Sequence, residues 1–221
     1  MSRILALSLA TVILTLLLAA PHVDTQAQDE VEVAIRWTRY INPTDGRDVA
    51  YGTCVFGDYV AVMGVEGSNR PYVALLHKSD GDVVREWIGS VRGALYNCIS
   101  VGERLYAVGA THDSYGVIYV FDKNLGVLTR VRNESQSVYS SIAYDGKALY
   151  IGGWKEWVGL VEKRALDESL SLVSSKKIYF DSWSGGLISD IGVEPSTGRI
   201  WAVGWYYDSN GKGHSLIVIL D

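Results

Sequence analysis

The residues best suited to chemistry in this chain are aromatic side chains that stand beside carboxylates and amides. The sequence holds seven Trp and 14 Tyr against three Phe, so most of its rings carry a polar group. Ring faces stack on sugars while neighbouring polar groups bond their hydroxyls, and Trp, Tyr and Arg also dominate protein interfaces. The candidate ligand-binding residues are Trp154, Trp157, Trp183, Trp205, Tyr206, Tyr207, Asp113, Asp208, Glu156 and Arg70. The alternative for each ring is a structural role, packed between sheets or under loops.

Paired carboxylates offer an enzymatic alternative. Asp181 with Asp208 or Glu156 has the residue types of a glycosidase, but the separation of the two carboxyl groups decides that mechanism. His112 and His214 fall in expected loops, where lone histidines are more often solvated than catalytic. The sequence holds no convincing nucleophile elbow, phosphate loop or histidine-rich metal motif. It therefore predicts no catalytic residue, no cofactor and no metal site, and an enzyme is the less favoured interpretation.

The elements that must position these residues follow from a repeat. An apolar run that ends in glycine occurs four times, at residues 60–64, 105–109, 149–153 and 200–204. The terminal glycines are separated by 45, 44 and 51 residues. That period is typical of β-propeller blades and not of helical repeats. The runs around each glycine are short, apolar or alternating, and separated by turn residues, which is the pattern of strands.

The repeat predicts an all-β fold, a four-bladed propeller built from four-stranded antiparallel blades. The expected blades are residues 50–90, 95–133, 138–178 and 186–221, the last one strand short. Residues 32–40 resemble the outermost strands of the other blades, so we expect them to complete the fourth blade and close the ring. Closure would remove the open sheet edges. The alternatives are an incomplete last blade or pairing with a second copy.

Propeller topology sends the loops between second and third strands, and those between blades, to one face. The loop expected between the second and third blades covers residues 133–139. That face would carry the candidate ligand-binding residues listed above. The opposite face consists of tight turns rich in Gly, Asp and Asn. The sequence therefore predicts that function resides on the aromatic face.

The two cysteines, Cys54 and Cys98, belong to the innermost strands of neighbouring blades. Aligning those strands on their apolar residues places Cys54, Cys98, Ser141 and Asp190 at one level around the axis. The thiols then either form a disulfide, as in an oxidising compartment, or remain small buried free cysteines. Asn133 begins a short N-glycosylation pattern on the aromatic face.

The second repeat resembles the secreted SBBP-type β-propeller repeat family. It has an apolar strand that ends in glycine (105–109), a polar loop, a second apolar strand that ends at Asp122, and a glycine turn at Gly126. The fourth repeat fits similarly, whereas the third has Trp154-Lys155-Glu156-Trp157 in place of a small-residue loop. The resemblance covers about residues 50–221. It implies a propeller fold and an extracellular setting, and it implies no catalytic residues.

The first residues predict export. One Arg precedes an apolar run over residues 4–20, and small residues at Thr25 and Ala27 suit a signal peptidase. We expect a signal peptide over residues 1–27 and a single domain over residues 28–221. An uncleaved N-terminal anchor is the alternative, because 17 apolar residues nearly span a bilayer.

The charge balance narrows the partners. The chain has a formal net charge of −5 and no run of Lys or Arg, which argues against nucleic acid and against anionic membrane surfaces. Membrane contact is expected only through an uncleaved anchor. The sequence thus favours a secreted or cell-surface binding module with carbohydrate as its ligand. The alternatives are a structural propeller that binds cell-envelope proteins and a glycan-active enzyme.

Overall fold

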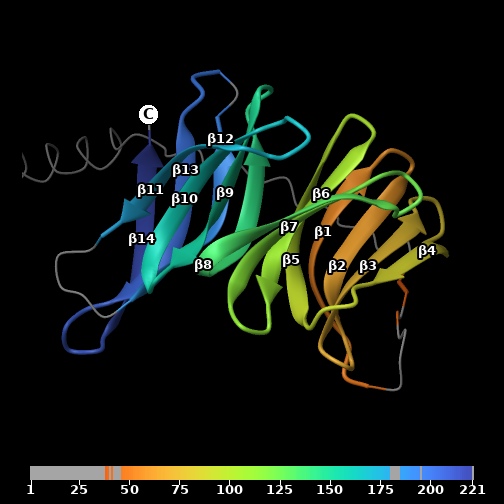
Figure 1. Cartoon of the computed structure of the whole chain (residues 1–221), viewed down its shortest axis with the longest axis horizontal. Coiled ribbons are helices and arrows are strands. Elements are labelled where there is room, and N and C mark those ends of the chain that lie inside the picture. Colours follow the sequence, from red (N-terminus) through yellow and green to blue (C-terminus); the bar gives the residue numbers. More distant parts are fainter. Residues whose placement is uncertain (1–37, 40, 42–45, 180–184, 195, 221) are drawn as a thin grey trace, which may run out of the picture. The chain divides into compact units, whose positions relative to one another are not determined.

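The fold was analysed in a computed structural model, which describes residues 38–39, 41, 46–179, 185–194 and 196–220. The regular structure of these residues consists entirely of antiparallel β-strands, as Figure 1 shows, and they contain no helix. The sequence-based prediction of an all-β, antiparallel fold is therefore confirmed. No helix within these residues is long and apolar enough to cross a membrane. The expected leader at residues 1–27 lies outside the described residues.

Fourteen strands are arranged in three sheets. The first sheet has the order β1 (Val49–Phe56), β2 (Tyr59–Glu66), β3 (Arg70–His77) and β4 (Val83–Ile88). The second has the order β11 (Leu172–Ile178), β10 (Val158–Ala165), β9 (Ala148–Lys155), β8 (Val127–Tyr144), β7 (Tyr115–Phe121), β6 (Arg104–Thr111) and β5 (Gly93–Val101). The third has the order β12 (Gly186–Val193), β13 (Ile200–Tyr207) and β14 (Gly213–Leu220).

The seven-stranded sheet is two four-stranded units that share one long strand. Residues 127–136 of β8 pair with β7, and residues 137–144 pair with β9. The interblade loop expected over residues 133–139 was wrong, because this segment stays extended. The amide of Ser137 donates to the carbonyl of Ser114 at 2.7 Å, which holds the middle of β8 against the β6–β7 turn. The chain thus builds four consecutive units, here called units one to four, that begin at β1, β5, the second half of β8 and β12.

The units do not close into a ring among the described residues. Unit four has three strands, and no described strand pairs with the outer edge of β14. Residues 38, 39 and 41 are described and are not in a strand, whereas the rest of the expected closing strand lies outside the described residues. The closed four-bladed ring therefore stays a prediction.

The four repeat glycines have the same structural role. Each lies on the second strand of its unit, opposite a bulge in the innermost strand. A Cβ atom on Gly64, Gly109, Gly153 or Gly204 would lie 2.1, 2.0, 1.9 or 2.0 Å from a carbonyl oxygen of that strand. Only a residue without a side chain permits this approach, which explains why the glycine recurs once per unit.

Consecutive units bury their apolar faces against each other. One core lies between units one and two and includes Met63, Leu75, Leu95 and Phe121. The second joins units two and three, and the third joins units three and four. Units one, two and three thus each have one face covered by the unit that follows.

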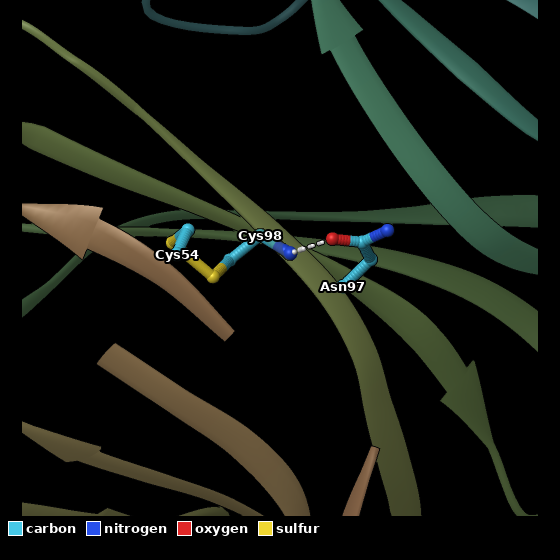
Figure 2. The surroundings of a disulfide bond; sticks show 3 residues. All are labelled: Cys54, Asn97 and Cys98. Carbon is cyan, nitrogen blue, oxygen red and sulfur yellow. Dashed lines mark hydrogen bonds between the residues drawn. A yellow bond between two sulfur atoms is a disulfide. The ribbon is translucent and has the colours of Figure 1, made fainter. Parts of the chain in front are cut away.

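A disulfide joins the innermost strands of units one and two. Cys54 on β1 and Cys98 on β5 are bonded, with their Cα atoms 5.8 Å apart, and Figure 2 shows the side chain of Asn97 beside the bridge. The Oδ1 atom of Asn97 accepts the Cys98 amide at 2.7 Å. The innermost strands of units three and four are linked by a hydrogen bond, which the Ser141 hydroxyl donates to Asp190 Oδ1 at 2.6 Å.

The predicted common level of the four residues was wrong for the two cysteines. In each unit, one residue of the innermost strand pairs with the residue that precedes the repeat glycine, and residues at this position lie at the same level. They are Gly52, Asn97, Ser141 and Asp190. Cys98 instead occupies the buried position that Ile142 and Ile191 take in their units.

We predict that Gly109→Ala destabilises the domain by roughly 2 kcal/mol or more, because the new methyl group would overlap the Ala94 carbonyl and the bulge would have to rearrange. Gly192→Ala is the matched control, since a Cβ there meets nothing within 4 Å. Chemical denaturation of both variants measures the difference. Equal midpoints for the two variants would contradict the role assigned to the repeat glycine.

Candidate ligand-binding site

The tightest turn of the loop face presents a tryptophan in an unusual backbone conformation. Glu156 and Trp157 alone connect β9 to β10, and their φ angles are 52° and 69°. Positive φ at both central residues is the pattern of a type I′ hairpin turn, which normally contains Asn and Gly. A bulky side chain in the left-handed region is a genuine outlier that costs about 1–2 kcal/mol. The turn therefore carries backbone strain at the residue whose side chain is Trp157.

The same backbone position is left-handed in the first two units, where the residues are Asn69 and Ser114. In each of three units the carbonyl of this residue accepts an amide from the first residues of the following innermost strand region. The three bonds join Gly93 to Asn69 at 2.8 Å, Ser137 to Ser114 at 2.7 Å and Gly186 to Trp157 at 3.0 Å. The left-handed conformation therefore belongs to the frame, whereas the tryptophan side chain at this position does not.

Two pairs of aromatic rings meet around the start of β12. Trp154 and Trp157 are stacked, with ring centroids 5.2 Å apart and an angle of 13° between the planes. Trp205 and Tyr207, on β13, form an edge-to-face pair at 5.0 Å. Trp157 is 63% exposed and Trp154 is half-buried. Ring faces are thus available to a ligand, which the purely structural interpretation of these rings does not predict.

These four rings, with Gly185, Gly186 and Leu187, line a small pocket of about 170 Å³, here called the aromatic pocket. Backbone bonds fix its walls, since the Tyr207 amide donates to the Gly185 carbonyl at 2.9 Å. The pocket is smaller than the roughly 300–1,000 Å³ typical of drug-sized ligands. It accordingly has room for one small ring or side chain.

Charged groups stand at the rim of this region. Glu156 pairs with Lys177 at 2.6 Å, and the Lys177 ammonium lowers the pKa of the Glu156 carboxyl. His214 lies 3.0 Å from Asp208, and its hydrogen bond lowers the pKa of that carboxyl. Tyr206 stacks on His214 at 5.0 Å and, by strand alternation, faces away from Trp205 and Tyr207.

The two described carboxylates of the enzymatic hypothesis do not have the properties of a glycosidase acid. A general acid needs a raised pKa, whereas the pKa values of Glu156 and Asp208 are lowered. Asp181 and Trp183 lie outside the described residues. Within those residues no group of three or more His, Cys, Asp or Glu side chains could hold a metal ion.

The remaining candidates are located elsewhere. Arg70 forms an ion pair at 2.6 Å with Glu66, which is fully buried. Asp113 lines a different pocket, described below. Asn133 lies within β8, and its amide nitrogen donates to Tyr139 Oη at 3.0 Å and to Glu162 Oε1 at 3.4 Å. A glycan on this nitrogen replaces one N–H hydrogen and would therefore remove one of these bonds.

Sequence reasoning found all four rings of the aromatic pocket but missed its floor. Gly185, Gly186 and Leu187 begin the innermost strand of unit four, and the Gly-Gly pair was the signal that a ligand or backbone approaches closely there. Lys177, the partner of Glu156, carried no such signal.

Comparison with known proteins adds little to this site. No protein-family model matches the chain, and no curated protein matches it. The crystal structure of Raptor from Chaetomium thermophilum is similar with a TM-score of 0.47 and 10% sequence identity. The similar region covers 77% of this chain and 20% of the Raptor chain, so this protein spans about a fifth of that chain's length. A likeness at this level carries no conclusion about function.

We predict that Trp157→Gly is more stable than Trp157→Ala by about 1 kcal/mol, because both remove the ring but only glycine relieves the left-handed backbone. Thermal or chemical unfolding of the two variants isolates the strain of the turn. If the alanine variant were equally stable or more stable, the turn would not be strained.

Proposed function

We propose that this protein is a secreted or cell-surface binding module whose aromatic pocket takes a sugar ring of a carbohydrate. The observation that carries the proposal is the meeting of four aromatic rings around one small pocket, at a turn whose strain the frame does not require. Strain of this kind gathers at functional sites. The flat stacked pair supplies an apolar surface for a pyranose face, and Glu156, Lys177 and Asp208 supply hydrogen-bonding groups near it.

The proposed setting outside the cytoplasm rests on two observations. The first residues have the layout of a signal peptide or an anchor, and the two cysteines are joined in a disulfide. Membership of the SBBP-type repeat family belongs to the same proposal, on the residues given above.

A cell-envelope protein is the second candidate ligand, and one observation favours it. The face of unit four that points away from unit three exposes Trp201, Val203, Ile217 and Ile219 beside the aromatic pocket. Ile217 is 72% exposed. Contiguous exposed apolar surface with aromatic anchors is typical of protein interfaces. This candidate requires the units to form an open row, because in a closed ring unit one would cover the same face.

We further propose that the four units are the blades of a closed propeller. The outer strand of unit one contacts the following unit through Arg85, whose Nη2 atom donates to Asn124 at 3.1 Å. The corresponding residue of unit two, Thr129, donates to the Glu168 carbonyl at 3.1 Å. Arg39 makes the equivalent contact with unit one, since its Nε atom donates to the Gly81 carbonyl at 3.1 Å and it also pairs with Asp82.

The correspondence extends two residues further along the chain. Trp87 and Val131 pack into the cores that follow their own units, and Ile41 packs in the same way on Tyr72 and its buried neighbours. Arg39 and Ile41 thus make the contacts expected of an outermost strand in a unit before unit one. This supports the hypothesis that residues 32–40 complete unit four and connect it to unit one.

The carbohydrate proposal predicts saturable binding of the protein to a polysaccharide in a panel of neutral and acidic glycans. Trp157→Ala is expected to weaken that binding roughly tenfold, the loss of one stacked ring, while leaving the fold intact. Trp201→Ala is the matched control, because it removes an exposed Trp outside the aromatic pocket. Tryptophan fluorescence or calorimetry measures both.

The outcomes separate the two candidate ligands. Loss of glycan binding in the Trp157 variant alone supports the carbohydrate module. Absence of glycan binding, together with capture of an envelope protein that requires Trp201, would favour the interaction module instead. Turnover of any glycan would contradict a pure binding role.

Ring closure predicts slow hydrogen exchange along β14. In the full chain, the β14 amides that do not donate to β13 should be protected from hydrogen exchange. In a closed ring, carbonyl oxygens of residues 32–40 would accept hydrogen bonds from these amides, or that segment would cover them. The outward amides of β4 are the internal control, since that strand has one neighbour in its sheet. Fast exchange at both edges would contradict closure, and protection that depends on protein concentration would indicate pairing with a second copy.

A further inference from the structure

A second pocket on the loop face is lined by three arginines. It has a volume of about 440 Å³ and lies between units one and two. Arg92 comes from the β4–β5 connection, Arg130 and Arg132 come from β8, and His112 and Asp113 come from the β6–β7 turn. It shares no lining residue with the aromatic pocket. This site, here called the arginine pocket, is therefore separate from the site of the proposed function.

Strand geometry and stacking hold two of these arginines side by side. Arg130 and Arg132 are two residues apart on β8, so they project from the same face of the sheet. The Arg132 guanidinium lies 3.9 Å from the centre of the Tyr115 ring, and that of Arg130 lies 5.4 Å from Tyr119. Stacking uses the flat face of the Arg132 guanidinium and leaves the N–H groups of its edge for another partner. Arg130 also forms a hydrogen bond with the Tyr119 hydroxyl, which orients its guanidinium.

The third arginine is held by the loop that carries it. The carbonyl of Arg92 accepts the His112 amide at 3.0 Å, which joins the β4–β5 connection to the β6–β7 turn. The two loops that form the wall of the pocket are thus fixed relative to each other. The arginine pocket is preorganised by backbone bonds in the same way as the aromatic pocket.

Positive charge exceeds negative charge in this pocket, because three arginines and one carboxylate, that of Asp113, line it. The whole chain has a net charge of −5, yet three arginines converge on one pocket. None of the ion pairs formed among the described residues involves Arg92, Arg130 or Arg132, and Asp113, which also lines the pocket, pairs with none of them. Like charges brought together without a counter-charge repel, and a bound anion relieves that repulsion.

We infer that the arginine pocket binds an oxyanion, the carboxylate, sulfate or phosphate group of an acidic ligand. Planar guanidinium forks match the oxygen pairs of such groups and form short, charge-assisted bonds to them. The Thr111 hydroxyl and the His112 ring add polar groups to the lining.

An adjoining pocket has room for the remainder of a larger ligand. It measures about 240 Å³, shares Thr111 and His112 with the arginine pocket, and contains the rings of Tyr51 and Tyr96 in edge-to-face contact at 5.2 Å. Tyr51 is half exposed. An acidic group held by the arginines could thus belong to a molecule whose ring contacts these tyrosines, or to a free inorganic anion.

The test is calorimetric or NMR titration of the full chain at constant ionic strength. The probes are inorganic sulfate, inorganic phosphate, an oligogalacturonate and a neutral malto-oligosaccharide. The variant is Arg130→Gln with Arg132→Gln, which keeps side-chain length and hydrogen bonding but removes two charges. Arg104→Gln is the matched control. Arg104 is an exposed arginine at the start of β6, whereas Thr111, at the other end of that strand, lines the arginine pocket.

We expect saturable binding of at least one acidic probe, weakened by roughly tenfold or more in the double variant and unchanged in Arg104→Gln. Tighter binding of oligogalacturonate than of the inorganic ions would identify an organic acid as the ligand, and equal binding per charge would identify a free anion. Trp157→Gly should leave this binding intact, so failure of the carbohydrate proposal would not affect the result. Equal affinity in the double variant and the control, or preference for the neutral sugar, would overturn the inference.

Discussion

The close approach of two backbones at each repeat glycine is the constraint on which the rest of this fold depends. In every unit, a Cβ atom added to the repeat glycine of the second strand would lie about 2 Å from a carbonyl oxygen of the innermost strand. The innermost strand bulges opposite that glycine. A bulge bends its strand and increases the local twist. Each of the three cores lies between successive units, whose innermost strands all carry such a bulge.

The same frame dictates where the loops lie. The left-handed residue at the end of the turn between the second and third strands holds the next unit through its carbonyl, at Asn69, Ser114 and Trp157. Asparagine adopts this conformation readily and serine less so, but tryptophan does so only at a cost. Because the hydrogen bond is the same in all three units, the frame explains the conformation and leaves the choice of tryptophan to another cause. A ligand for its exposed ring is such a cause.

The sequence was most informative at positions where the backbone geometry permits only one residue type. The glycine spacing predicted four consecutive antiparallel units because no other residue fits at the bulge. The alignment of Cys54 and Cys98 with Ser141 failed because it relied on apolar side chains. Val55 is exposed, whereas Cys98 fills the buried position that isoleucine occupies in units three and four. The prediction of a loop at residues 133–139 was wrong because this part of β8 is half exposed and rich in polar residues. Such a strand has the same polar composition as a loop. Four of the six candidate rings line one pocket, and three of these four lie in or next to turns of the same face. Tyr206 stacks on His214 instead, and Trp183 lies outside the described residues.

The two pockets share one structural origin, because each takes lining residues from a segment by which the chain enters a new unit. At the middle junction β8 runs without interruption from unit two to unit three, so no separate loop forms there. At the other two junctions the chain leaves the sheet, after β4 and after β11, and both pockets take lining residues from the re-entering segment, Arg92 in one case and Gly185 in the other. A re-entering loop packed against the turn of the preceding or following unit makes a walled hollow. The side chains that line each hollow are free of the packing constraints of the core, so one carries arginines and the other carries aromatic rings on an otherwise repeated frame.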